Sequence, residues 1–197
     1  GDLRDLHSFP TRRSSDLTFQ KEVTSVLVVG DFGIFAHALR DFFDRKRSFF
    51  RRQVYFLEGN HEEFSHFERL VEKYKDRFTY LPRGTVHTID GYRFLALGGS
   101  KYMDPLNTPM GSVIQGRDID KALSYAPQEV DIVLTHDCPR SIGVPCTPGL
   151  EYYGPTGFER SEEISIRFRP RLWIFGHHHK WFQTVLEIGR ASCRERG

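Results

Sequence analysis

Four apolar runs in this sequence are each followed by side chains that can bind a metal ion. These side chains are Asp31, Asn60, His136 and the three consecutive histidines His177, His178 and His179. Ligand sites in α/β proteins gather at the carboxyl ends of strands, so we expect these side chains to meet at one sheet edge. A carboxylate can bridge two cations, imidazole suits Zn, Mn and Fe, and an amide oxygen is a neutral hard ligand. This mixture favours a two-metal centre for phosphoester chemistry.

The elements that must position these side chains follow an α/β order. The pattern predicts buried strands at 24–29, 53–57, 130–134 and 172–175, a hairpin of strands 84–89 and 92–97, amphipathic helices at 34–47, 64–74, 117–125 and 158–168, and a closing strand at 182–186. Strand–helix alternation with polar residues at strand ends indicates an α/β fold with its site at one edge.

Composition excludes several classes of function. The chain has 197 residues, 39% of them hydrophobic, and a net charge of +2, which gives no strong nucleic-acid signal. No apolar run reaches the roughly 18 residues of a membrane span. Three cysteines without a Cys-x₂-Cys pair argue against both a disulfide framework and a structural zinc site, and suit a cytoplasmic protein. We interpret the basic and aromatic segment 45–52 as a solvated helix end.

The two ends of the sequence are related through their codons. One codon choice for residues 8–17 has a reverse complement that translates as residues 187–196, in order. We therefore predict that residues 1–17 and 187–197 are non-native, adapter-derived segments, and that 18–186 forms one domain.

The strand-end motifs carry a family resemblance. Gly30-Asp31, Gly59-Asn60-His61, Thr135-His136 and Gly176-His-His-His179 resemble four of the five signature motifs of the calcineurin-like metallophosphoesterases. The resemblance spans nearly all of 18–186. It implies two mixed β-sheets packed as a sandwich and flanked by helices, with the first strand missing from this chain.

The resemblance also implies roles for single residues. Two divalent ions of Mn, Fe or Zn type would be bound, with Asp31 as the bridge between them. The first ion would also be bound by Asn60, His136 and His177, and the second by His179. A metal-bound hydroxide would be the nucleophile. His61 would protonate the leaving group, with Glu62 as its orienting neighbour.

One family motif departs from the pattern. The family begins with Asp-x-His after a first strand, and no such strand precedes residue 24 within 18–186. The segment 5–7 has the spacing but follows no apolar run, so we interpret it as unrelated and expect impaired activity. Two alternatives stay open: a non-catalytic scaffold of the same fold, and a nucleic-acid phosphodiesterase. The sequence leaves the substrate open among phosphorylated small molecules, proteins and nucleotides.

Overall fold

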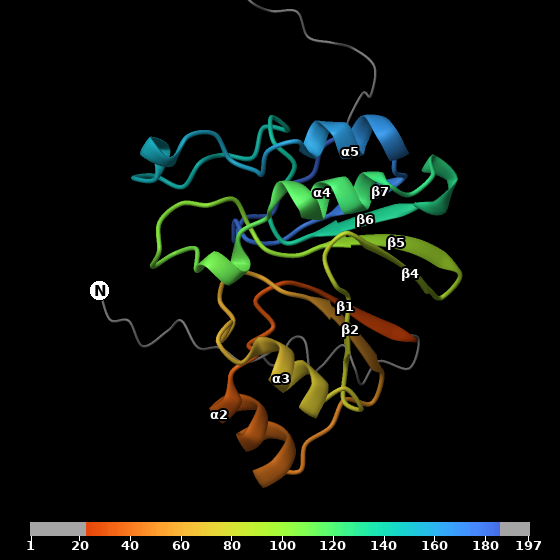
Figure 1. The fold of residues 1–197 in the computed structure, drawn as a ribbon, viewed down its shortest axis with the longest axis vertical. Helices are drawn as coiled ribbons and strands as arrows, with labels where there is room; N and C mark the ends of the chain where they lie inside the picture. The colour runs from red at the N-terminus through yellow and green to blue at the C-terminus, as the bar shows by residue number, and fades with distance from the viewer. Residues whose placement is uncertain (1–22, 186–197) are drawn as a thin grey trace, which may run out of the picture.

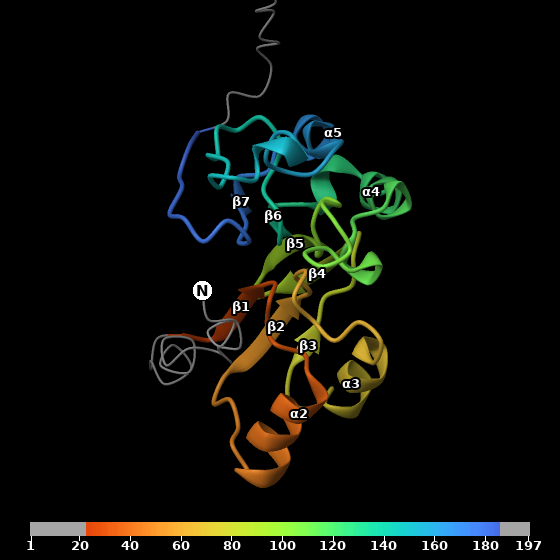
Figure 2. The same ribbon diagram turned by 90° about the vertical axis from the view of Figure 1, so that its left-hand side faces the viewer.

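The computed structural model describes residues 23–185, and within this part no helix is long and apolar enough to span a membrane. The predicted adapter-derived segments 1–17 and 187–197 lie outside the described residues. Two sheets pack face to face, with helices α2 and α3 on one outer side and α4 and α5 on the other (Figures 1 and 2). The predicted two-sheet fold flanked by helices is therefore confirmed.

The first sheet is parallel. Its strands are ordered β1 (Ser25–Val29), β2 (Gln53–Leu57) and β3 (Thr79–Tyr80). The predicted helix 34–47 begins later, as α2 (Ala36–Leu39), and continues as the π-helix Arg40–Arg45. Helix α3 (Phe67–Lys73) completes the cover of this sheet. The two-residue β3 was not predicted, because so short a segment shows no period.

The second sheet is mixed. Its order is β4 (Thr85–Ile89), β5 (Tyr92–Leu97), β6 (Ile132–Thr135) and β7 (Leu172–Ile174), with β4 antiparallel to β5 and the remaining pairs parallel. The predicted hairpin turn is confirmed, since Asp90 and Gly91 both have positive φ, 48° and 83°.

The remaining elements cover this sheet or connect its strands. Helices α4 (Gly116–Leu123) and α5 (Ser161–Phe168) pack on its outer face, and short 3₁₀ turns lie at Met110–Ser112, Pro127–Glu129 and Glu151–Tyr153. The predicted closing strand does not form within 182–185, and Leu186 lies outside the described residues.

Alternating side chains divide the core into layers. Along β5, Leu95 and Leu97 join the cluster beneath α4 and α5, whereas Phe94 and Ala96 face the first sheet. Along β2, Phe56 is directed towards the helices α2 and α3. Successive side chains of a strand point to opposite faces of the sheet, so a strand covered on both faces needs apolar side chains on both. Both sheets are therefore fixed by packing on two sides, which makes their strand ends a rigid frame.

Candidate metal centre

The predicted ligands lie just beyond the carboxyl ends of parallel strands from both sheets. Asp31 follows β1, Asn60 follows β2, His136 follows β6 and His177 follows β7. The backbone N–H of Gly176 donates to the carbonyl of His136 at 3.0 Å, which ties the ends of β6 and β7 together. The two sheets thus deliver four ligand-type side chains to one place.

His136 is at the centre of this group and is 1% exposed. Its Nδ1 lies 2.8 Å from the carbonyl oxygen of Val29, which only accepts, so Nδ1 carries the ring proton. Its Nε2 lies 3.0 Å from Asn60 Oδ1 and 3.5 Å from Asp31 Oδ2. In a ring without a proton on Nε2, this nitrogen and the two oxygens offer three electron pairs at one place, an arrangement that a cation stabilises.

The orientation of Asn60 is fixed from its other end. Its Nδ2 donates to the backbone carbonyl of Asn107 at 2.7 Å, so Oδ1 is the atom left facing His136. Asp31 has a φ of 51° and accepts the backbone N–H of His61 at Oδ1, at 3.0 Å. A Cβ on Gly59 would lie 1.9 Å from that same Oδ1, so only glycine permits this approach.

The three histidines after β7 separate into different environments. His177 stacks edge-on against His136 with ring centroids 4.9 Å apart, and burial lowers the pKa of His177 to about 4, which keeps it in the neutral, metal-ligating form. His178 lies beside Asp137, with Nε2 3.1 Å from Oδ1. His179 is exposed and lines, with His177, a groove along β7. Asn60 and Asp31 are thus brought to His136, and His177 packs on the His136 ring, although Asp31, His136 and His177 do not place their ligand atoms within 4.8 Å of one another as Asp137, Cys138 and His178 do. Among residues 23–185, no hydrogen bond, ion pair or ring contact joins His179 to these four side chains.

Glu62 holds the loop that carries Asp31. Its two carboxylate oxygens accept the backbone N–H groups of Phe32, Gly33 and Ile34 at 2.9, 3.1 and 2.5 Å. Burial raises the pKa of Glu62 to about 8, and the nearby charge of Asp31 adds to the shift. The side-chain oxygens of Glu62 therefore support the backbone after Asp31, and the orienting of His61 that the family resemblance implies stays a prediction.

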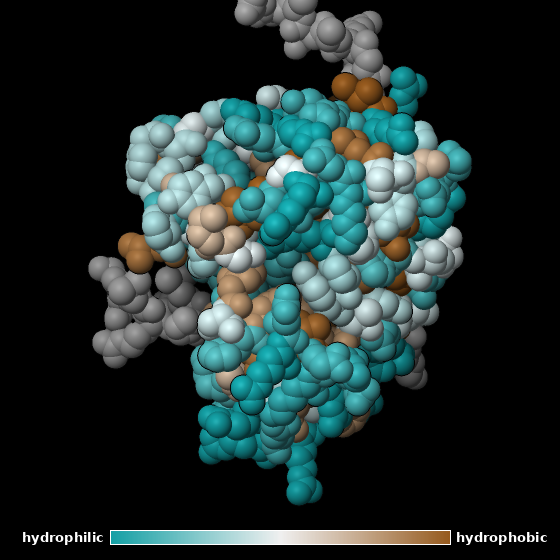
Figure 3. Space-filling view, viewed as in Figure 1, coloured by the Kyte–Doolittle hydropathy of each residue, from teal (hydrophilic) through white to brown (hydrophobic). Residues whose placement is uncertain are grey.

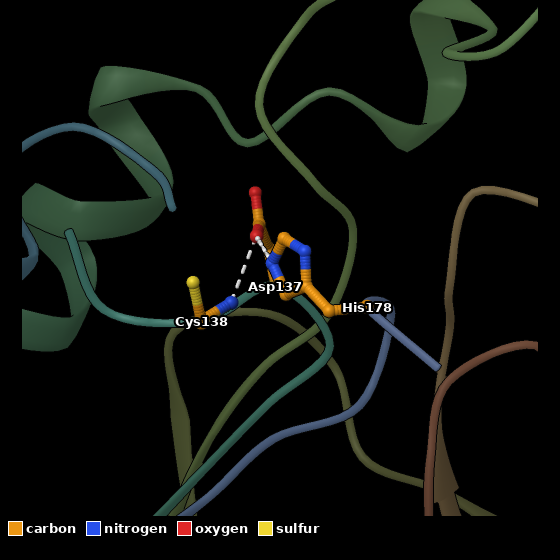
Figure 4. Close-up of side chains that lie close together, drawn as sticks. All are labelled: Asp137, Cys138 and His178. Atoms are coloured by element: carbon orange, nitrogen blue, oxygen red, sulfur yellow. Dashed lines mark hydrogen bonds and ion pairs between the residues drawn. The ribbon is translucent and has the colours of Figure 1, made fainter. Parts of the chain in front are cut away.

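A second cluster involves a residue that the sequence analysis did not select. The carboxylate of Asp137 is 1% exposed and accepts hydrogen bonds from His178 and from the backbone N–H of Cys138 at 2.8 Å (Figure 4). It also accepts the backbone N–H of Lys101 at 3.0 Å. Ligand-type atoms of Asp137, Cys138 and His178 lie within 4.8 Å of one another. Burial raises the pKa of the Cys138 thiol to about 12, which disfavours the thiolate that metals bind. This geometry favours a structural role, in which hydrogen bonds of Asp137 join the segments that follow β5, β6 and β7. The sequence offered one signal for Asp137, namely that it directly follows the predicted ligand His136.

A cavity of about 150 Å³ lies beside the centre. Asn60, His61 and His177 contribute to its wall, as does Tyr153 from the long loop 139–155. His61 is exposed, so its ring is accessible to a bound molecule. The nitrogen and oxygen ligand atoms at the centre fit a divalent cation. The neighbouring cavity, with the exposed His61 imidazole in its wall, fits a small polar group bound to that cation.

Comparisons with known proteins agree with the fold and show the family of the chain. A sequence model of the calcineurin-like phosphoesterase family matches residues 5–181. The lariat debranching enzyme of Schizosaccharomyces pombe is 24% identical over 180 residues, which covers 72% of this chain and 37% of that protein. This chain thus spans just over a third of that relative's length. A solved crystal structure matches with a TM-score of 0.57 at 13% identity, covering 84% of this chain and 77% of that one, which shows a shared fold.

Proposed function

Because the chain belongs to the calcineurin-like phosphoesterase family, we propose that it hydrolyses phosphoester bonds with two divalent cations held at the ends of β1, β2, β6 and β7. The observation that supports this most is the position of the buried His136 Nε2, 3.0 Å from Asn60 Oδ1 and 3.5 Å from Asp31 Oδ2. The family match begins at residue 5, outside the described residues, so the loss of the first motif stays a prediction.

The proposed role of each site residue follows from its position. Asp31, Asn60, His136 and His177 would hold one cation, with Asp31 as the bridge and His179 as a ligand of a second ion. Bound divalent ions supply positive charge that neutralises phosphoryl oxygens and acidifies water. Buried hydrogen bonds to Val29 and Asn107 keep His136 and Asn60 oriented before any ligand arrives, which lowers the cost of binding.

His61 is the candidate general acid. Its backbone N–H is held by Asp31, and its ring is exposed at the cavity. Protonation of the leaving oxygen by a positioned imidazole contributes roughly 10²–10⁴-fold. A scaffold without activity has no need for an exposed imidazole beside metal-ligating side chains, so this pairing favours an enzyme.

The test uses two esters that differ in leaving group. We expect the chain with Mn²⁺ to hydrolyse p-nitrophenyl phosphate and phenyl phosphate, and EDTA to abolish both activities. His61→Ala should lower kcat roughly 10²–10⁴-fold for phenyl phosphate and much less for p-nitrophenyl phosphate, because nitrophenolate leaves without a proton. The control is His66→Ala, which removes another exposed histidine that contacts Glu63. Equal losses on both esters would exclude the acid role of His61, and no metal-dependent activity on either would favour the scaffold.

A second candidate function is phosphodiester hydrolysis, which the name of the S. pombe relative, a lariat debranching enzyme, favours. Bis(p-nitrophenyl) phosphate separates the two functions, because a diesterase cleaves it faster than p-nitrophenyl phosphate. The phosphorylated partner, whether small molecule, protein or nucleotide, and the predicted cytoplasmic location stay predictions.

A further inference from the structure

Two adjacent tyrosines, of which one is exposed and one is half-buried, form an aromatic pair beside the candidate centre. Tyr152 and Tyr153 have ring centroids 4.1 Å apart at 38°, and Tyr152 is 75% exposed. They belong to the short 3₁₀ turn Glu151–Tyr153 in the loop 139–155. An aromatic side chain as exposed as Tyr152 adds little to the core, so packing in the core does not explain why a tyrosine stands at this position.

The inner ring of the pair is anchored at both ends. The hydroxyl of Tyr153 donates to the carboxylate of Asp104, and its backbone carbonyl accepts from Lys101 Nζ at 3.2 Å. Asp104 also accepts the backbone N–H groups of Leu106 and Asn107, at 2.8 and 2.9 Å, which stiffens its own loop. Tyr152 therefore packs at a tilt against a ring that is already held in place, and its exposed surface needs little further ordering to bind a flat group.

One ring of the pair reaches the cavity beside the metal centre. Tyr153 lines this cavity with Asn60, His61 and His177, and Tyr152, which is not part of the wall, packs against Tyr153. The loop that holds Tyr153 through Asp104 also supplies the carbonyl of Asn107 that orients Asn60. Loops 101–109 and 139–155 project to the same side of the molecule (Figure 1). A molecule with its phosphate at the centre would thus extend along this rim.

A third aromatic side chain lies near the pair. The face drawn in Figure 3 is mainly hydrophilic, and its hydrophobic residues form scattered groups. Tyr102, 51% exposed, adds a third aromatic ring from the neighbouring loop, and Tyr102 and Tyr153 line a common pocket of about 360 Å³. Aromatic rings beside a phosphate site are what base stacking requires, and stacking accepts any base.

We propose that Tyr152, supported by Tyr153, is a stacking platform for the nucleobase of a nucleotide phosphate ester. This proposal rests on the proposed phosphoesterase function, because the phosphate of the same ligand occupies the metal centre. Each stacked base contributes roughly 1–3 kcal/mol, which corresponds to about 5- to 100-fold in affinity. The platform therefore selects nucleotide esters over phosphate esters without a base.

The test compares two ligands that share a ribose 5-phosphate and differ in the base. Isothermal titration with Mn²⁺ measures the dissociation constants of adenosine 5′-monophosphate and ribose 5-phosphate. We expect the nucleotide to bind about 5- to 100-fold more tightly. Tyr152→Ala should remove this difference and Tyr152→Phe should keep it, since the phenyl ring still stacks. Tyr92→Ala is the matched control, because Tyr92 is equally a surface tyrosine, 51% exposed at the start of β5.

The outcomes separate this proposal from the function on which it rests. Equal affinity for the two ligands, no binding of either, or a difference that survives Tyr152→Ala would overturn the platform. Base-dependent binding that Tyr152→Ala abolishes would support it. If that binding is found without EDTA-sensitive hydrolysis of any ester, the phosphoesterase proposal fails while the platform stands.

Discussion

Replacement of Glu62 by alanine tests how the loop after β1 is held. The carboxylate accepts three backbone N–H groups, two of them, from Phe32 and Ile34, in buried positions. Each of the two unsatisfied buried donors costs about 1–3 kcal/mol, so we expect Glu62→Ala to lower the free energy of unfolding by about 2–6 kcal/mol. With a urea m-value of about 2 kcal/mol/M, the unfolding midpoint should fall by about 1–3 M.

The adjacent Glu63 provides the matched control. Its carboxylate also accepts a backbone N–H, that of Ala36 at 2.7 Å, but at an exposed position where water replaces it. Glu63→Ala should therefore cost about 1 kcal/mol or less. Urea unfolding followed by circular dichroism measures both variants. If the two variants unfold at the same urea concentration, Glu62 does not hold the loop as described.

Further predictions concern the backbone next to the centre and a distant ion pair. Gly30 has a φ of 94°, and a Cβ there would lie 2.0 Å from His136 Nδ1, whereas Gly33, at 88°, has no atom within 4 Å of an added Cβ. Gly30→Ala should therefore abolish Mn²⁺ binding in calorimetry, and Gly33→Ala should cost only about 1 kcal/mol of backbone strain; equal metal affinity in both variants would contradict this. Arg93 lowers the pKa of Asp131 to about 2 from 3.8, so the pair stabilises the fold above pH 3.8 and loses this effect as pH falls through 2. The Tm difference between wild type and Asp131→Asn should thus shrink from pH 5 to pH 2, and a constant difference would refute it.

Much of the fold follows from local sequence pattern. The run Gln53–Leu57 forms β2 as predicted, because buried strands need continuous apolar residues between turn signals. The Asp90-Gly91 turn was predictable since both positions require positive φ. The two-residue β3 was not, because its place depends on pairing with Tyr55 and Phe56, far away in the chain.

Part of the candidate site was likewise predictable from the sequence, and part was not. Asp31, Asn60 and His136 were predictable because each follows a strand of a parallel pair, and the fold brings such ends together. The hydrogen bond of Asp137 with Lys101 and the contact of Glu62 with the loop after β1 were not, since each joins segments about 30 residues or more apart. Residues that position a metal ligand are identified by their contacts in the folded structure, and the spacing of residues in the sequence does not predict these contacts.

The central claim is that four strand-end side chains form one divalent cation site. Calorimetric titration of the chain with Mn²⁺ tests it most directly, with His136→Ala as the variant and His66→Ala as the control. We expect tight binding of Mn²⁺ to wild type and to His66→Ala, and its loss in His136→Ala, because His136 Nε2 is the buried donor that faces Asn60 and Asp31. Binding of Mn²⁺ to His136→Ala with the affinity of wild type, or no binding to wild type, would contradict the account.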